Sequence, residues 1–121
     1  MKNFSKYNVS EGQPRVELHD QLALTGAEVS INELPAGASV PFVHYHKQNE
    51  EIYLIQSGKG KMVVDDEEIA LNAGDWLRVA PAGRRQIFAA ADSALRYICI
   101  QVKENSLEAY TANDGVVATE G

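Results

Sequence analysis

Cysteine is almost absent from this chain, which carries a single one at position 99. An internal disulfide is therefore excluded, and this usage is typical of a reducing compartment such as the cytoplasm. Cys99 stands in the apolar run Tyr97-Ile98-Cys99-Ile100, which favours a buried, unreactive thiol over a nucleophile. Long apolar runs are also missing, so we predict no membrane span. The first residues lack the apolar core and cleavage site of a signal peptide.

Basic residues are scarce relative to acidic ones. The chain has 11 lysines and arginines against 17 aspartates and glutamates, a formal net charge of −6. A general nucleic-acid or anionic-membrane binder needs a basic surface, so we expect neither partner. The densest acidic run, Asp65-Asp66-Glu67-Glu68, lies between apolar stretches and is predicted to form a solvated hairpin turn. It lacks the spaced oxygen ligands and central glycine of a calcium loop.

No long segment has the 3.6-residue periodicity of a helix, and turn residues recur about every ten residues. This pattern predicts an all-β sandwich or barrel. The length of 121 residues suits one domain spanning the whole chain, with a barrel core over about residues 22–103. The first dozen residues and the tail from about Thr111 are expected to be short extensions, which either fray or pack on a second subunit.

Short apolar segments separated by turn residues give the predicted strands. These strands cover residues 22–24, 27–34, 42–46, 51–56, 61–64, 69–71, 76–79, 86–89 and 95–102. Two glycines within residues 57–60 are expected to bend the chain between two of these strands. A weak helix candidate covers residues 105–110.

Two of the three histidines lie two residues apart, at His44 and His46. In an extended segment such residues point to the same face, so both imidazoles can aim at one point. Glu51 follows a short polar turn and can add a carboxylate from the next strand. Two imidazoles and one carboxylate form a common ligand set for a divalent transition metal. The third histidine, His19, lies in a polar stretch and is predicted to be at the surface.

These residues resemble the two motifs of the cupin family. The first motif combines a glycine, His-x-His, a glutamate and a closing glycine, matched here by Gly37, His44, His46, Glu51 and Gly58. The second combines a glycine with Pro-x-Gly, matched by Gly74, Pro81 and Gly83. The resemblance covers about residues 34–102 and implies a double-stranded jelly-roll β-barrel with short N- and C-terminal extensions.

The chain departs from the family pattern in three places. The spacings from Gly37 to His44 and from Gly74 to Pro81 are each one residue longer than usual, as small bulges would make them. The position of the family's further metal-binding histidine holds Gln86. Three roles stay open for Gln86: a weak metal ligand through its carbonyl oxygen, a substrate contact, or an internal hydrogen bond.

The resemblance implies one divalent transition metal ion, namely iron, manganese, nickel or zinc. Its expected ligands are His44, His46, Glu51 and Gln86. The leading hypothesis is a metal-dependent enzyme of the oxygenase, isomerase or decarboxylase type that acts on a small polar oxygenated metabolite. The alternative is a barrel that binds or senses a sugar-like small molecule without catalysis, and a purely structural role ranks last. Small cupins commonly form dimers, so a homodimer is expected.

Several other polar side chains are candidates for catalysis or substrate binding at such a site. Glu50 and Tyr53 are the candidate catalytic groups, because the two histidines would be occupied by the metal. Tyr53 and two arginines, Arg78 and Arg84, are the candidate substrate contacts. Arg84 and Arg85 follow the Pro-x-Gly turn, where an arginine could bind a substrate carboxylate or phosphate through two parallel hydrogen bonds. The alternative is that both are solvated turn charges. Arg78 interrupts an apolar strand, so we expect it to face the cavity or a subunit interface.

Overall fold

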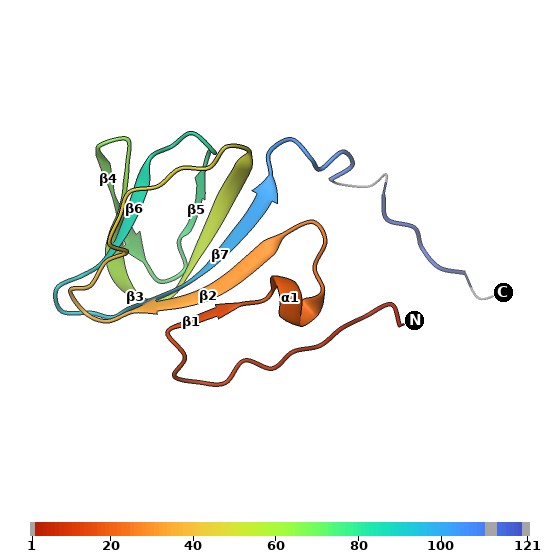
Figure 1. The fold of residues 1–121 in the computed structure, drawn as a ribbon, viewed down its shortest axis with the longest axis horizontal. Coiled ribbons are helices and arrows are strands. Elements are labelled where there is room, and N and C mark those ends of the chain that lie inside the picture. The colour runs from red at the N-terminus through yellow and green to blue at the C-terminus, as the bar shows by residue number, and fades with distance from the viewer. Residues whose placement is uncertain (1, 111–113, 120–121) are drawn as a thin grey trace.

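The computed structural model describes residues 2–110 and 114–119, and shows a jelly-roll barrel of antiparallel strands (Figure 1). The strands are β1 (Arg15–Glu17), β2 (Glu28–Leu34), β3 (Asn49–Val64), β4 (Glu67–Asn72), β5 (Trp76–Val79), β6 (Arg85–Ala89) and β7 (Leu95–Lys103). One helical turn, α1 (His19–Leu22), joins β1 to β2. No helix among the described residues has the length and apolar character needed to cross a membrane. The predicted all-β class is confirmed.

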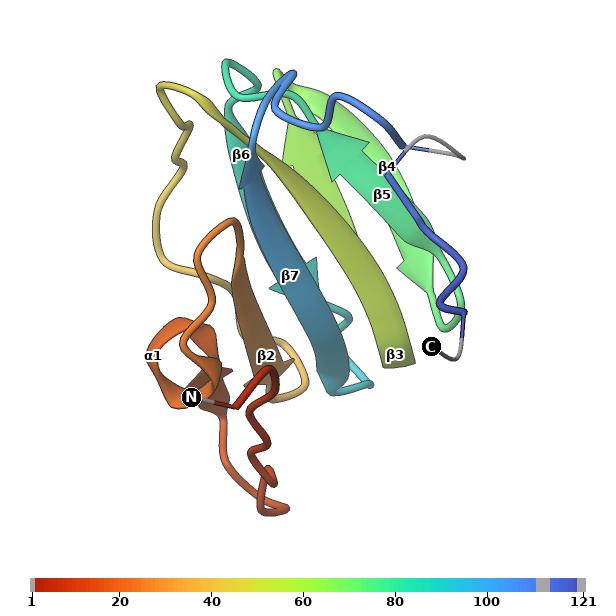
Figure 2. The same cartoon turned by 90° about the vertical axis from the view of Figure 1, so that its right-hand side faces the viewer.

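The long strand β3 belongs to both layers of the barrel. Its first part pairs with β7 and β5, in a first layer ordered β1-β2-β7-β3-β5. Its second part lies between β4 and β6 and forms the second layer. In Figure 2 the first layer faces the viewer, with β2, β7 and β3 side by side and β6 behind them. Alternate side chains near the start of β3, such as those of Glu51 and Tyr53, therefore lie between the two layers.

The prediction that residues 57–60 bend the chain between two strands is wrong, because β3 continues through this segment with only a register shift between Ile55 and Ser57. The two glycines of this segment instead allow neighbouring backbone to come close to β3. A Cβ atom at Gly58 would lie 1.8 Å from the carbonyl oxygen of Ala94, and one at Gly60 would lie 2.1 Å from that of Phe88. The backbone of β3 therefore lies too close to Ala94 and Phe88 to leave room for a side chain at either glycine.

Other element predictions also need correction. The strand expected at 22–24 is the end of α1 followed by Ala23 in the left-handed region (φ 54°). Residues 42–46 form no strand and are tied to β6 by a single bridge at His44. The helix expected at 105–110 is absent from these described residues. Regular structure begins at Arg15, before the expected core. The sequence did not predict this strand, because the three residues of β1 are too few to show a periodicity. Part of the predicted tail, residues 111–113, lies outside the described residues.

Inward-facing side chains of the two layers form one apolar core. Its fully buried members include Ile55, Met62, Leu71 and Leu95, together with the thiol of Cys99. In β7, buried and half-buried residues alternate from Leu95 to Cys99, as expected for a strand with one face on the core. The prediction of a buried Cys99 is thus confirmed.

The outer surface of the first layer is also apolar. Paired positions place Val29, Ile100 and Ile52 in one row, and Ile31, Ile98, Leu54 and Trp76 in the next. We call these seven residues the outer apolar face. Trp76 is 64% exposed and the other six are half-buried. Figure 2 looks onto the strands that carry this face.

Candidate metal centre

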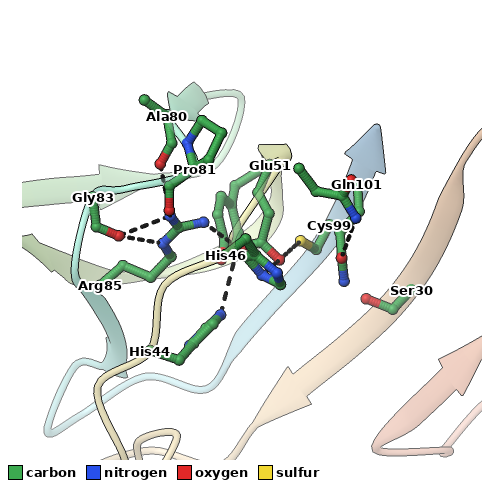
Figure 3. Close-up of polar contacts among 12 residues, drawn as sticks. Ser30, His44, His46, Glu51, Ala80, Pro81, Gly83, Arg85, Cys99 and Gln101 are labelled. Carbon is green, nitrogen blue, oxygen red and sulfur yellow. Dashed lines mark hydrogen bonds and ion pairs between the residues drawn. The ribbon is translucent and has the colours of Figure 1, made fainter. Parts of the chain in front are cut away.

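Backbone pairing fixes the two neighbouring histidines although they lie outside any strand. The amide of His44 donates to the carbonyl of Arg85 at 3.0 Å, and the amide of Arg85 donates back at 2.9 Å. The amide of His46 donates to the carbonyl of Pro81 at 2.9 Å. Glu51 faces inward from β3 and is 3% exposed. The three side chains converge as the sequence predicted (Figure 3).

His44, His46 and Glu51 offer ligand atoms that all lie within 4.8 Å of one another. Nε2 of His46 lies 3.1 Å from Oε2 of Glu51, and Nε2 of His44 lies 3.6 Å from Oε1. Among the described residues, Nδ1 of His44 and Nε2 of His46 are buried without a hydrogen-bond partner. The two imidazoles and the carboxylate together form a ligand set that fits a divalent metal ion.

Glu51 is held asymmetrically. Its Oε1 accepts hydrogen bonds from the Tyr53 hydroxyl at 2.5 Å and from Nη1 of Arg85 at 2.7 Å. Its Oε2 lies beside His46 and accepts a contact from the thiol of Cys99 at 3.4 Å. Oε1 thus accepts the two short hydrogen bonds, from Tyr53 and Arg85, whereas Oε2 lies closer to the imidazole of His46.

The surroundings set the charge of each group. Burial opposes ionisation of Glu51, but hydrogen bonds from Tyr53 and Arg85 and the nearby His46 outweigh it and hold the pKa of this carboxyl below its usual value. Burial, aided by the charge of Arg85, lowers the pKa of His44 and favours the neutral imidazole that can bind a metal. Burial and the charge of Glu51 raise the pKa values of Tyr53 and Cys99, so both stay protonated.

The sequence predicts Arg85, like Arg84, to be a substrate contact or a solvated turn charge, whereas the structure buries it beside Glu51. Its side chain is 0% exposed and is ion-paired with Glu51. The remaining guanidinium contacts go to backbone carbonyls of the turn before β6, namely those of Ala80, Pro81 and Gly83, at 2.7–2.9 Å. Figure 3 shows the guanidinium between this turn and Glu51. Arg85 thus links the second motif to the candidate metal ligand.

Gln86 lines the same cavity but is anchored elsewhere. Its Nε2 donates to the carbonyl of Val40 at 2.8 Å, which matches the internal hydrogen bond among the roles left open for it. The buried residues of β6 are Arg85, Ile87 and Ala89. Adjacent strand residues face opposite sides, so Arg85 rather than Gln86 points inward to Glu51.

Glu50 and Arg78 do not meet the centre. Nε of Arg78 donates to Glu50 at 2.6 Å, and Nη2 donates to Glu104 at 2.7 Å. Neither Glu50 nor Arg78 lines the cavity, and Arg78 lies on the outer surface of β5. Of the two positions expected for Arg78, the cavity is excluded, because the alternation of β5 turns Val79 inward instead, and a subunit interface stays a prediction.

Tyr53 and Arg84 have different surroundings. Tyr53 is 3% exposed, lines the cavity and donates its hydroxyl hydrogen to Glu51. Arg84 is exposed and its guanidinium lies 4.7 Å from the ring centroid of Tyr45, a cation–π contact. It lines a separate pocket beside Asp65 and Asp66, not the cavity of the histidines. His19, which the sequence analysis placed at the surface, has a half-exposed side chain.

The cavity between the layers has a volume of about 520 Å³. One part of its wall is the cluster of His44, His46 and Glu51. The polar remainder of the wall includes Arg15, Ser30, Asn32, Gln86 and Gln101. A volume of this size accommodates a small metabolite beside a metal ion.

The comparisons with known proteins agree with this geometry. The sequence model of the cupin domain family matches residues 30–101. A crystal structure of a cupin protein from Bacteroides fragilis is 66% identical, covers 98% of this chain and 100% of that chain, and superimposes with a TM-score of 0.95. A sugar phosphate isomerase of the cupin superfamily from Silicibacter pomeroyi is 22% identical over 74% of this chain and 60% of its own, with a TM-score of 0.66. An uncharacterized protein of Methanocaldococcus jannaschii is 28% identical over 95 residues, 77% of this chain and 75% of its own.

Proposed function

The chain belongs to the cupin family, and on that premise we propose that it is a metal-dependent enzyme acting on a small polar oxygenated metabolite. The reaction would be of the oxygenase, isomerase or decarboxylase type. The observation that carries the proposal is the convergence of His44, His46 and Glu51 in the wall of a cavity of about 520 Å³. Nε2 of His46, which is buried without a hydrogen-bond partner and lies 3.1 Å from Oε2 of Glu51, supports a bound ion at this cluster.

The chain's own residues would prepare this centre. An iron, manganese, nickel or zinc ion held by His44, His46 and Glu51 would act as a Lewis acid on an oxygen of the substrate. Tyr53 and Arg85 orient Glu51 through Oε1, which leaves Oε2 on the side of His46. The protonated Tyr53 donates a hydrogen bond here, so its position supports an orienting role rather than that of a base.

A second candidate function is binding or sensing of a small molecule without catalysis. The observation that favours it is the ion pair between Arg85 and Glu51 at 2.7 Å. A buried guanidinium already compensates the only carboxylate of the cluster, which weakens the attraction of Glu51 for a cation. Gln86, anchored to Val40, adds no imidazole to offset this loss.

Metal content separates the two candidates. We expect near-stoichiometric iron, manganese, nickel or zinc in protein purified without a metal-chelating tag, and loss of the metal in the double variant His44→Ala/His46→Ala. The matched control is His19→Ala, because His19 lies outside the cluster and should not change the metal content. Elemental analysis makes the measurement. Wild-type protein that holds no metal even after reconstitution would refute the metalloenzyme and favour the binding barrel.

We further propose that the protein forms a homodimer through the outer apolar face. Seven large apolar side chains in two registered rows form an unusually apolar surface for a solvated strand layer. The charged groups beside it are paired within the chain: Arg78 with Glu50 and Glu104, and Arg96 with Glu33. Such a balanced surface suits a second copy of itself better than a nucleic acid or an anionic membrane. The N-terminal strand β1 pairs with β2 of the same chain, so we do not assign the dimer contact to it.

Light scattering coupled to gel filtration tests the dimer. We expect the mass of two chains for wild-type protein at micromolar concentration and the mass of one chain for Ile98→Lys, which places a charge in the outer apolar face. Phe88→Lys is the matched control, because Phe88 is a half-buried apolar residue of the second layer. A wild-type protein with the mass of one chain would contradict the proposal. We also propose a cytoplasmic location, which the use of a single, buried cysteine, Cys99, supports.

A further inference from the structure

Arg15 reaches the cavity from a part of the chain that precedes the family match. The match begins at residue 30, whereas Arg15 opens β1. Its side chain nevertheless lines the same cavity as His44, His46 and Glu51. The N-terminal strand thus contributes a cationic group to the centre described above.

The register of β1 explains this placement. Arg15 pairs with Asn32, and Asn32 pairs with Tyr97 on β7. Paired residues of antiparallel strands share a face, and both Asn32 and Tyr97 are buried on the cavity side. Val16, the next residue, points the other way, as the alternation of a strand requires.

A buried amide holds the guanidinium in place. Nη1 of Arg15 donates to Oδ1 of Asn32 at 2.5 Å, and Nδ2 of Asn32 donates to Oγ of Ser30 at 3.0 Å. Asn32 and Ser30 are 5% and 4% exposed. Burying an amide is unfavourable unless its polar atoms are hydrogen-bonded, and here both Arg15 and Ser30 satisfy it. The polar pair Asn32–Ser30 therefore orients Arg15 instead of filling the core.

The charge of Arg15 is weakly compensated. Nε lies 3.7 Å from Oε1 of Glu17, and both side chains are more than half exposed, so water screens this pair. The other charged groups of the cavity wall have their own partners: Arg85 pairs with Glu51, and Glu33 pairs with Arg96. Of the described residues that line the cavity, Arg15 is thus the charged group best placed to attract an anion.

We propose that Arg15 binds an anionic oxygen group, a carboxylate or a phosphate, on the ligand whose other end reaches the cluster of His44, His46 and Glu51. This assignment rests on the proposed function for the ligand's contact with the cluster of His44, His46 and Glu51. It narrows the proposed metabolite to one that carries a carboxylate or a phosphate. A planar guanidinium offers two parallel hydrogen bonds to either group, which a neutral sugar hydroxyl cannot match.

Thermal unfolding with small probes tests the assignment. The probes are oxalate, malonate, succinate and inorganic phosphate, with malonamide as the neutral counterpart of malonate. We expect at least one anion to raise the melting temperature of wild-type protein by several degrees, because a ligand that binds only the folded state stabilises it. The rise should fall by at least half in Arg15→Gln, return in part in Arg15→Lys, and stay unchanged in Arg78→Gln. Arg78 is the matched control, since it is an exposed arginine outside the cavity.

Running the series on metal-loaded and metal-free protein separates the two proposals. A full rise in Arg15→Gln, an equal rise with malonamide, or no rise with any anion in either form of the wild type would overturn the role of Arg15. Failure to load metal would overturn the proposed function alone, because the metal-free series still reports whether anion binding depends on Arg15. Malonate and phosphate distinguish the two anion classes within the same experiment.

Discussion

Replacing Arg85 with methionine is expected to lower the free energy of unfolding by about 3–5 kcal/mol, because it leaves a buried charge without its partner. Methionine keeps most of the volume of the arginine side chain but removes all of its hydrogen-bond donors. Glu51 would then remain buried and charged without its cation, and the carbonyls of Ala80, Pro81 and Gly83 would lose the guanidinium that joins them. Urea denaturation monitored by the fluorescence of Trp76 measures the change.

Two further variants decide whether the unpaired charge of Glu51 causes the loss of stability in Arg85→Met. Arg84→Met removes the adjacent, exposed arginine and should change stability by no more than about 0.5 kcal/mol. Arg85→Met combined with Glu51→Gln removes the unpaired charge and should recover part of the loss. An Arg85→Met protein as stable as wild type would show that the ion pair contributes nothing to the fold. A double variant no more stable than Arg85→Met alone would point to the lost contacts with the backbone carbonyls instead.

Substituting alanine for Gly58 is expected to lower the free energy of unfolding by about 3–5 kcal/mol, for a steric reason. The added Cβ would lie 1.8 Å from the carbonyl oxygen of Ala94, so β3 or the start of β7 would have to move. The φ of Gly58 is +80°, a value that alanine adopts only with strain. The same denaturation experiment reports the loss.

Gly74→Ala is the matched control for this change. Gly74 also has a positive φ, of +93°, but nothing lies within 4 Å of a Cβ built there. Only the conformational cost remains, so we expect a loss of about 1–2 kcal/mol. Equal losses in the two variants would mean that backbone strain, and not the contact with Ala94, makes glycine necessary at position 58.

Much of the fold could be predicted from the sequence because its signals are local. Turn residues mark the ends of β4 to β7, and the apolar residues between them give the strands. The errors fall where long-range pairing decides the outcome. Gly58 and Gly60 have the composition of a turn, yet they lie inside β3 because neighbouring backbones approach there. The three residues of β1 carry no periodic signal, and only their pairing with β2 makes them a strand.

The candidate site divides in the same way. His44 and His46 could be found from their spacing, and Glu51 from its place at the start of a strong strand. The inward face of β6 was harder, because Arg84, Arg85 and Gln86 are consecutive polar residues and a shift of one position exchanges the two faces. The signal was present in the next residues: Ile87 and Ala89 are buried, which assigns Arg85 to the interior. No spacing rule could associate Arg15 with the cavity.

The sharing of β3 between the two layers has a consequence for how the protein unfolds. Glu51 near one end and Met62 near the other belong to the same continuous strand, although Glu51 pairs with β5 and β7 and Met62 pairs with β4 and β6. One layer cannot open without releasing the strand that the other layer needs, so hydrogen exchange in β4 and β7 should share one opening event. A ligand bound at Glu51 would then slow exchange across the whole barrel and protect amides that it never touches.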